Sequence, residues 1–323
     1  MTQKENMLRL LKGDKPDYVP YGLESVRTFW HRDARFYFGN GDPSALEWTD
    51  IWGVDWKLGD PNASESFYPV THPLEKLESL DDLGSFSFPD PCESGVFAEV
   101  RPEIEKLDRD ENLLMLSNPG CLFTRAWLLR GMENFLMDML LEPEGAEALL
   151  DRILAYQEAI LAQELSFKPD IVYFGDDVGT TSALMMNPEL WRRMIKPRWA
   201  KLVRACREAG CFVLLHSCGK IEDIIGDIIE IGVNMLNPLQ ASANNLDFLK
   251  SKARGKLTLY GGMDSDLLVR GSVDEVKNLA SRVLKTLGEG GGYIANPDQS
   301  LPFPQENIDA LRETVQREGK LAI

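Results

Sequence analysis

The amino-acid sequence predicts an α/β protein built as a (β/α)8 TIM barrel with an elaborated N-terminal region. Two observations carry this prediction. Short, continuously apolar segments alternate with longer amphipathic segments through the C-terminal half, as in parallel strands that are buried on both faces. The apolar segments also end in polar residues, and the carboxyl ends of strands are where barrel enzymes collect their functional groups. A doubly wound sheet with a second domain is the alternative architecture.

The C-terminal half contains the clearest elements. Apolar residues recur at helical spacing over 143–167, and Pro143 suits a first helical turn. Further helices are expected at 188–209, 221–229, 246–252 and 273–287, and a last helix is expected to begin near 305. The strands expected between the helices are DIVYFGDD, CFVLLHS, VNMLNP, KLTLYGG and GGYIAN. This order of elements predicts a parallel sheet.

The N-terminal half is less regular. A short amphipathic helix is expected in MTQKENMLRLLKG, and strands are expected in YVPYGL and NLLMLSNPG, with VDWKLG as a weaker candidate. We expect one domain over 1–323, with an N-terminal extension over about 1–110. This extension is rich in aromatic residues: Phe29, Trp30, Phe36, Phe38, Trp48, Trp52 and Trp56. Most of them are expected in the core, and a lid over the barrel mouth is the alternative.

The composition excludes several classes of protein. The formal net charge of −16 argues against nucleic-acid binding and against an anionic membrane surface, because both need a basic face. No apolar run approaches the roughly 18 residues that are needed to span a membrane. The five cysteines lack the spacing of a disulfide framework. We therefore expect a soluble cytoplasmic protein, and we leave open whether it forms a homodimer.

Polar residues gather where the expected strands end. We take Asp176 and Asp177 as catalytic candidates, although consecutive residues of a strand face opposite sides, so only one is expected to enter the site. The alternative interpretation is that Asp177 or Thr180 only caps the following turn. The candidates for binding substrate are Glu24, Asn118, Asn237, Tyr260 and Gln299. Other polar residues at strand ends are Gln240, Asp264, Asn296 and Asp298.

His216 and Cys218 are the candidate metal ligands. They stand two positions apart in an extended segment, so both side chains face the same side. Imidazole nitrogen and thiolate sulfur are zinc ligands, but a catalytic zinc site normally has three protein ligands. A buried cysteine beside a hydrogen-bonded histidine is the alternative interpretation of this pair.

The stretch LLHSCGKIEDIIGDIIEIGVNMLNPLQ resembles the uroporphyrinogen decarboxylase superfamily. Three other segments agree in order and spacing: IVYFGDDVGTTSALMMNPELWRRMIKPRWAKLV, LYGGMD and GGYIANPDQSLPFPQENIDAL. The resemblance is close from 169 to 311 and looser over SNPGCLFTRAWLLRGMENFLMDML. It implies a single (β/α)8 barrel.

The superfamily contains at least two chemistries, and the sequence departs from one of them. True uroporphyrinogen decarboxylases carry an arginine-rich segment that binds the carboxylates of the substrate, whereas this chain reads YVPYGLESVRTFWHRDARF there. The resemblance therefore favours the branch of corrinoid-dependent methyltransferases, in which zinc is bound by His-x-Cys and a distant third cysteine. His216 and Cys218 match the first two ligands. A corrinoid carried on a small partner protein is the implied methyl acceptor or donor.

The third ligand departs from the pattern of that branch. Where a Gly-Gly-Cys is expected, this chain reads ANPDQ, so the side chain of Asp298, Glu24, Asp177, Asp264 or Gln299 must complete a zinc site. A ligand set with more oxygen suits the polarisation of an oxygen-bound methyl group. We expect zinc as a Lewis acid and a small-molecule methyl donor such as a methoxylated aromatic compound. A metal-free decarboxylase and a non-catalytic corrinoid- or tetrapyrrole-binding protein are the alternatives.

Overall fold

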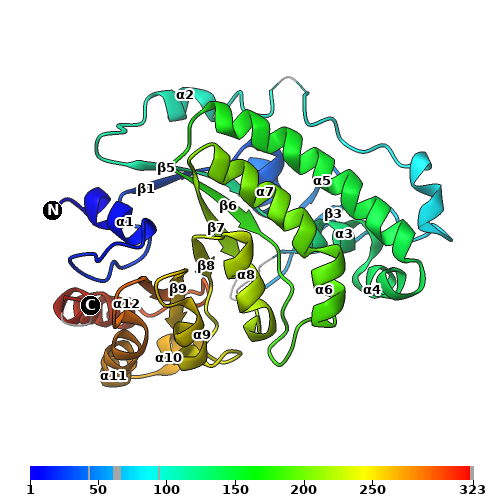
Figure 1. Ribbon diagram of the computed structural model, residues 1–323. Coiled ribbons are helices and arrows are strands. Elements are labelled where there is room, and N and C mark those ends of the chain that lie inside the picture. Colours follow the sequence, from blue (N-terminus) through cyan, green and yellow to red (C-terminus); the bar gives the residue numbers. More distant parts are fainter. Residues whose placement is uncertain (43, 61–66, 94, 321–323) are drawn as a thin grey trace.

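Seven parallel strands form a curled central sheet in the computed structural model, which describes residues 1–42, 44–60, 67–93 and 95–320 (Figure 1). In sheet order they are β1 (Val26–Phe29), β5 (Leu113–Asn118), β6 (Ile171–Gly175), β7 (Phe212–His216), β8 (Met235–Asn237), β9 (Thr258–Met263) and β10 (Tyr293–Pro297). The order in the sheet follows the order in the chain. A doubly wound sheet reverses direction at a switch point, so this topology excludes the doubly wound alternative.

Helices cover the outer face of the curled sheet (Figure 1). Their bounds are α2 (Arg101–Glu105), α3 (Phe123–Arg130), α4 (Met132–Leu141), α5 (Pro143–Ser166), α6 (Pro188–Met194), α7 (Lys196–Glu208), α8 (Ile225–Ile231), α9 (Leu246–Ala253), α10 (Ser265–Arg270), α11 (Val273–Val283) and α12 (Gln305–Glu318). The helix expected at 188–209 is divided in two at Ile195, because Pro197 occupies the first turn of α7. The α/β class and the five C-terminal strands are confirmed.

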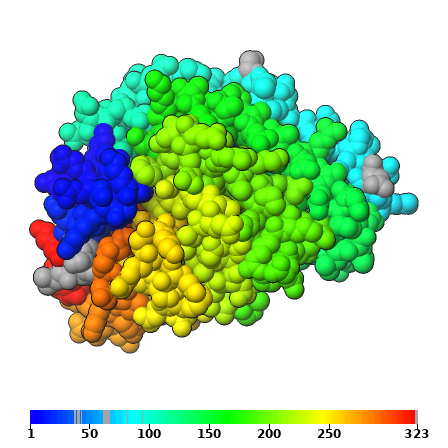
Figure 2. Space-filling model, in the orientation of Figure 1, coloured from blue at the N-terminus to red at the C-terminus, as the bar shows by residue number. Residues whose placement is uncertain are grey.

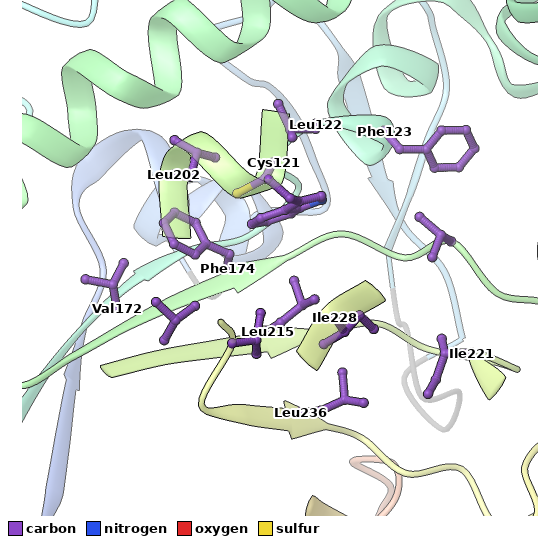
Figure 3. Close-up of a cluster of buried hydrophobic side chains, with 14 of the residues drawn as sticks. Cys121, Leu122, Phe123, Val172, Phe174, Leu202, Leu215, Ile221, Ile228 and Leu236 are labelled. Carbon is purple, nitrogen blue, oxygen red and sulfur yellow. The ribbon is translucent and has the colours of Figure 1, made fainter. Parts of the chain in front are cut away.

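Alternating side chains of the strands build two apolar cores. On the outer face, Val172, Phe174, Leu215 and Leu236 pack against the helices, as Figure 3 shows beside Leu202. On the inner face, a smaller cluster fills the curl of the sheet, and α1 (Gln3–Leu11) contributes to it. Its members are Met7, Leu10, Leu11, Leu113, Met115, Ile171, Leu214, Met235 and Ile294. The α1 side chains pack with residues at the amino ends of strands, such as Leu113, Ile171 and Met235, so the polar residues that face inward lie toward the carboxyl ends.

The expected N-terminal strand NLLMLSNPG is confirmed as β5, whereas the other expected strand differs from the prediction. The strand expected in YVPYGL is reduced to one bridge between Tyr21 and Ala295 of β10, because Pro20 has no N–H to extend the ladder. The carbonyl of Pro20 accepts a hydrogen bond from the Ala295 N–H at 2.9 Å, and the Gly22 N–H donates to the Ala295 carbonyl at 2.8 Å. These contacts join the N-terminal segment to the last strand of the sheet.

VDWKLG forms a strand, but not in the parallel sheet. It becomes β3 (Asp55–Leu58), the middle strand of a small antiparallel sheet with β2 (Glu47–Thr49) and β4 (Phe67–Pro69). Trp52 and Trp56 are buried there, and Trp48 stacks on Trp56 with ring centroids 6.4 Å apart. These tryptophans therefore belong to the core. Residues 61–66 of the expected lid, and the side chain of Phe38, lie outside the described part of the chain.

The N-terminal region contains two 3-10 segments, η1 (Arg32–Gly41) and η2 (Leu80–Ser85). A third 3-10 segment precedes α8, η3 (Glu222–Ile224), and a π-helical turn follows α11, η4 (Leu284–Gly288). The space-filling view shows the blue N-terminal segment packed against the orange C-terminal helices (Figure 2). Among the described helices, none combines the length and the apolar character that crossing a membrane requires.

Candidate metal centre

The alternation of side chains along two neighbouring strands selects the residues of the centre. Leu214 belongs to the inner core, so His216 and Cys218, two and four positions later, continue on the inner face. Ile171 places Asp177 on the same face by the same alternation. β6 and β7 pair in parallel, and the partner of His216 is Gly175, where a Cβ atom would lie only 3.2 Å from the Tyr173 hydroxyl oxygen. Adjacent strand ends therefore present all three side chains together.

Asp177, His216 and Cys218 form one compact cluster. A ligand atom from each lies within 4.8 Å of the other two. The His216 Nε2 atom is 3.5 Å from the Cys218 Sγ atom and 3.6 Å from the Asp177 Oδ1 atom. All three side chains are half-buried. The cluster is thus close enough to share one ion and open enough to receive a substrate.

The donor set fits zinc. A tetrahedral zinc ion with bonds of about 2.0 Å to nitrogen and 2.3 Å to sulfur holds those two atoms about 3.6 Å apart. The separation of 3.5 Å between His216 Nε2 and Cys218 Sγ matches this geometry. A carboxylate oxygen, an imidazole nitrogen and a thiolate sulfur are all zinc ligands. Three protein ligands would leave one position open, as in catalytic zinc sites.

Gln299 is the next polar side chain beside the cluster. Its Nε2 atom donates a hydrogen bond to Cys218 Sγ at 3.5 Å. Its backbone N–H donates to the Ser265 hydroxyl at 2.8 Å, which ties the segment after β10 to the start of α10. Among the residues considered for completing the site, Asp177 and Gln299 are the two that the structure brings to His216 and Cys218.

The other three oxygen candidates are engaged elsewhere. Asp298 is buried and accepts backbone N–H bonds from the loops after β8 and β9, both at 3.0 Å. Burial raises the pKa of Asp298. Asp264 caps the N-terminus of α10. Glu24 accepts hydrogen bonds from the Tyr18 hydroxyl at 2.7 Å and from the Tyr21 N–H at 3.2 Å, within its own segment.

Asp176 points away from the cluster, into the layer between the sheet and the helices. Its two oxygens accept the backbone N–H groups of Phe123 and Thr124 at the start of α3, at 3.2 and 2.7 Å. The Trp199 indole N–H donates to it at 3.1 Å. Burial raises its pKa to about 6, although these donors oppose the shift. The structure therefore places Asp177, and not Asp176, beside the metal-ligand pair.

Asn118 also faces outward. Its Nδ2 donates to the Glu164 carboxyl at 2.7 Å, and its Oδ1 lies 3.1 Å from His31 Nε2. All three side chains are buried. The preceding residue, Ser117, is the one on the inner face, because it pairs with Tyr173 in β6. Asn118 was expected to contact substrate, but it is Ser117, one position earlier, that faces the inside of the sheet.

Asn237 and Tyr260 lie on the inner face. Asn237 is the partner of His216 in the pairing of β7 with β8, and its buried Oδ1 atom has no hydrogen-bond partner among the described residues. Burial raises the pKa of Tyr260 to about 12. The sequence-based reasoning missed Tyr173, whose ring lies 5.9 Å from the His216 ring and 6.2 Å from that of Trp30. Tyr173 lies two residues after Ile171 and four before Asp177, so the alternation of side chains along the strand could have placed it on the same inner face.

Comparisons with known proteins identify the family of this chain and a solved structure with a similar fold. Residues 65–318 match the uroporphyrinogen decarboxylase (URO-D) family. A solved structure, a methyltransferase from Methanosarcina mazei, superimposes with a TM-score of 0.72 at 20% identity and covers 98% of this chain and 99% of its own. At that identity it shows the fold alone.

Two curated relatives share a shorter region. Methionine synthases from Methanothermobacter marburgensis and Methanothermobacter thermautotrophicus are 38% and 33% identical to this chain over 88 residues. The aligned part is 27% of this chain and spans only 28% of the length of each relative. These names accord with the resemblance to the methyltransferase branch. Because the family match extends over most of the sequence, the chain belongs to the uroporphyrinogen decarboxylase family.

Proposed function

We propose that this protein is a methyltransferase that moves a methyl group between a small-molecule donor and a corrinoid carried by a small partner protein. The observation that carries the proposal is the cluster of Asp177, His216 and Cys218 at the carboxyl ends of β6 and β7. Its mixed oxygen, nitrogen and sulfur donors fit zinc. The named relatives, a methyltransferase and two methionine synthases, support the reaction class.

The chain's own residues prepare the centre. Asp177 Oδ1 accepts the Cys218 backbone N–H at 2.7 Å, which holds the two ligands in one arrangement. Gln299 donates to the Cys218 sulfur and would stabilise its thiolate form. When bound, zinc would supply Lewis acidity toward the donor atom that carries the methyl group. The donor atom would keep the electron pair of the broken bond, and the methyl carbon would pass to cobalt(I) of the partner's corrinoid.

The donor set favours a methyl group bound to oxygen. The cluster contains one sulfur, and its third ligand is the carboxylate of Asp177, not a second cysteine. An oxygen ligand in place of a second sulfur makes the bound metal a harder Lewis acid, and a harder Lewis acid prefers an oxygen atom of the substrate. Tyr173 and Trp30 line the approach to His216 with aromatic rings. A methoxylated aromatic compound therefore fits this side of the centre.

We further infer that the curled sheet closes into one barrel domain over the whole chain. The bridge between Tyr21 and Ala295 and the two backbone hydrogen bonds beside it support closure. We also propose a cytoplasmic location, which the five free cysteines support.

Metal analysis tests the centre. Protein purified without chelators is expected to contain stoichiometric zinc, and Cys218→Ala is expected to lose it. Cys92→Ala is the matched control, because Cys92 is exposed and lies outside the cluster. Wild-type protein without stoichiometric metal, or a Cys218→Ala variant that keeps it, would contradict the proposal.

An activity assay tests the reaction. Conversion of free cob(I)alamin to methylcobalamin is followed by its absorption spectrum with a panel of methoxylated aromatic compounds. We expect turnover by the wild-type protein and by Cys92→Ala, and none by Cys218→Ala. Release of carbon dioxide from a carboxylated substrate, with Cys218→Ala still active, would favour the decarboxylase alternative.

A further inference from the structure

The loop that carries Cys218 is bound on several sides. On one side, the Asp177 carboxylate accepts the Cys218 N–H, and the Thr180 carbonyl accepts the Lys220 N–H at 2.7 Å. The Ser217 hydroxyl also accepts the Val178 N–H at 3.1 Å. The loop after β6 thus supports the loop after β7 along its whole length.

The two loops meet at a pair of glycines. A Cβ atom at Gly179 would lie 2.7 Å from the Cys218 carbonyl oxygen and 2.7 Å from the Lys220 nitrogen. Gly219, with φ of +80°, faces the backbone of Gly179 even more closely. No side chain fits between these backbones, so the position of Cys218 depends on their direct contact.

On the opposite side, two amide side chains from the loop after β8 hold the same segment. Gln240 accepts the Gly219 N–H through its Oε1 atom. Asn244 donates to the Gly219 carbonyl at 2.9 Å and accepts the Ile221 N–H at 3.0 Å. Asn244 is buried, and both ends of its amide are used. Together they bind three backbone groups within three residues of the thiolate ligand.

This loop after β8 is itself anchored to the strand that precedes Gln299. The N–H of Ala241 donates to the buried Asp298 carboxyl at 3.0 Å, next in sequence to Gln299. One segment, 240–244, therefore connects the loop that carries Cys218 with Asp298, the residue before Gln299.

We propose that Gln240 and Asn244 are positioning residues of the metal centre. They touch no ligand atom, but they fix the backbone at Gly219 and Ile221 so that Cys218 Sγ stays within reach of the donors of His216 and Asp177. This inference rests on the proposed metal-binding function. Groups that orient metal ligands in this way typically contribute about 10- to 100-fold to metal affinity.

Paired variants at Gln240 test the proposal. Gln240→Leu removes the acceptor for the Gly219 N–H, and Gln240→Glu keeps an acceptor oxygen at the same distance along the side chain. Asn245→Ala is the matched control, because Asn245 caps α9 through Phe248 N and makes no bond to the Cys218 loop. Thermal melting of the metal-free proteins shows that each variant folds, and Asn244→Ala gives a second, independent measurement.

The readouts are zinc affinity, by competition with a chromophoric chelator, and the absorption of the cobalt(II)-substituted proteins. We expect Gln240→Leu and Asn244→Ala to bind zinc about 10- to 100-fold more weakly and to lose thiolate-to-cobalt charge-transfer intensity. Gln240→Glu and Asn245→Ala should retain both properties.

Wild-type affinity and spectrum in Gln240→Leu would overturn the inference, as would an equal loss in Asn245→Ala. If the wild-type protein binds neither zinc nor cobalt, the proposed function fails instead. The two failures are therefore distinguishable in one set of titrations.

Discussion

Glu164, on α5, is a fully buried carboxyl group whose ionisation should oppose folding. Its side chain is 0% exposed, Asn118 donates to one oxygen, and the other oxygen has no hydrogen-bond partner among the described residues. Burial raises its pKa from 4.5 to about 8. Protonated Glu164 therefore stabilises the folded state relative to ionised Glu164. This contribution is complete below pH 4.5 and is lost as the pH rises through 8.

Replacement by glutamine should remove this dependence, because the neutral amide of Glu164→Gln resembles the protonated acid and could still accept the Asn118 hydrogen bond. The folded wild-type protein holds a proton that the unfolded chain has released, so its free energy of unfolding falls by about 1.4 kcal/mol per pH unit well below pH 8, and by about half as much at pH 8. Between pH 6.5 and 8 the wild-type protein should lose about 1.5 kcal/mol relative to Glu164→Gln.

The window from pH 6.5 to 8 avoids the opposing effect of His31. Burial lowers the pKa of His31 from 6.5 to about 4, so its neutral form is required in the folded state. His31 therefore adds stability as the pH rises from about 4 to 6.5, where it would mask the effect of Glu164. Above pH 6.5 the histidine is neutral in the folded state and more than half neutral in the unfolded state, so its remaining effect is small.

Urea unfolding followed by tryptophan fluorescence and circular dichroism measures the difference at pH 6.5, 7.2 and 8. Glu158→Gln is the control, because Glu158 is exposed on the same helix and should follow the wild-type protein. Parallel changes in the free energies of unfolding of wild type and Glu164→Gln would refute the reasoning. Such a result would mean that Glu164 is ionised in its buried position.

Two further predictions concern packing and charge. Gly179→Ala should lower the free energy of unfolding by about 1–3 kcal/mol and reduce bound zinc, because the new methyl group displaces the backbone of the Cys218 loop. Gly226→Ala, with nothing within 4 Å and a position in α8, should lower neither quantity in the same measurements. Asp50 and Arg125 form a buried ion pair at 2.9 Å, so Asp50→Ala should cost about 3–5 kcal/mol in urea unfolding. A loss below about 1 kcal/mol would contradict this view of the pair.

The sequence was most informative where short-range periodicity determines geometry. The spacing of His216 and Cys218 was enough to place their side chains on one face, because alternation in a strand depends only on position. The same rule separates Asp176 from Asp177, but which of them faces inward follows from the packing of Ile171 and Phe174 in opposite cores. Their hydropathy alone does not distinguish the two faces.

Features that depend on distant partners could not be predicted. Asp177 joins His216 because β6 pairs with β7 in a register that places Gly175 beside His216. The strand at Asp55–Leu58 has an ordinary strand pattern, which does not reveal that its partners are antiparallel neighbours. Asn118 ends a strand as expected, yet the partner that it meets is Glu164 on α5.

The pairing of Tyr21 with Ala295 brings together residues from opposite ends of the chain. During synthesis, the segment around Tyr21 emerges before its partner, and this pairing cannot form until β10 has left the ribosome. The sheet from β5 to β9 can form before that moment, since each of its strands pairs with its neighbour in sequence. This pairing must therefore wait for β10, and until then the backbone at Pro20 and Gly22 is available to chaperones or to other nascent chains.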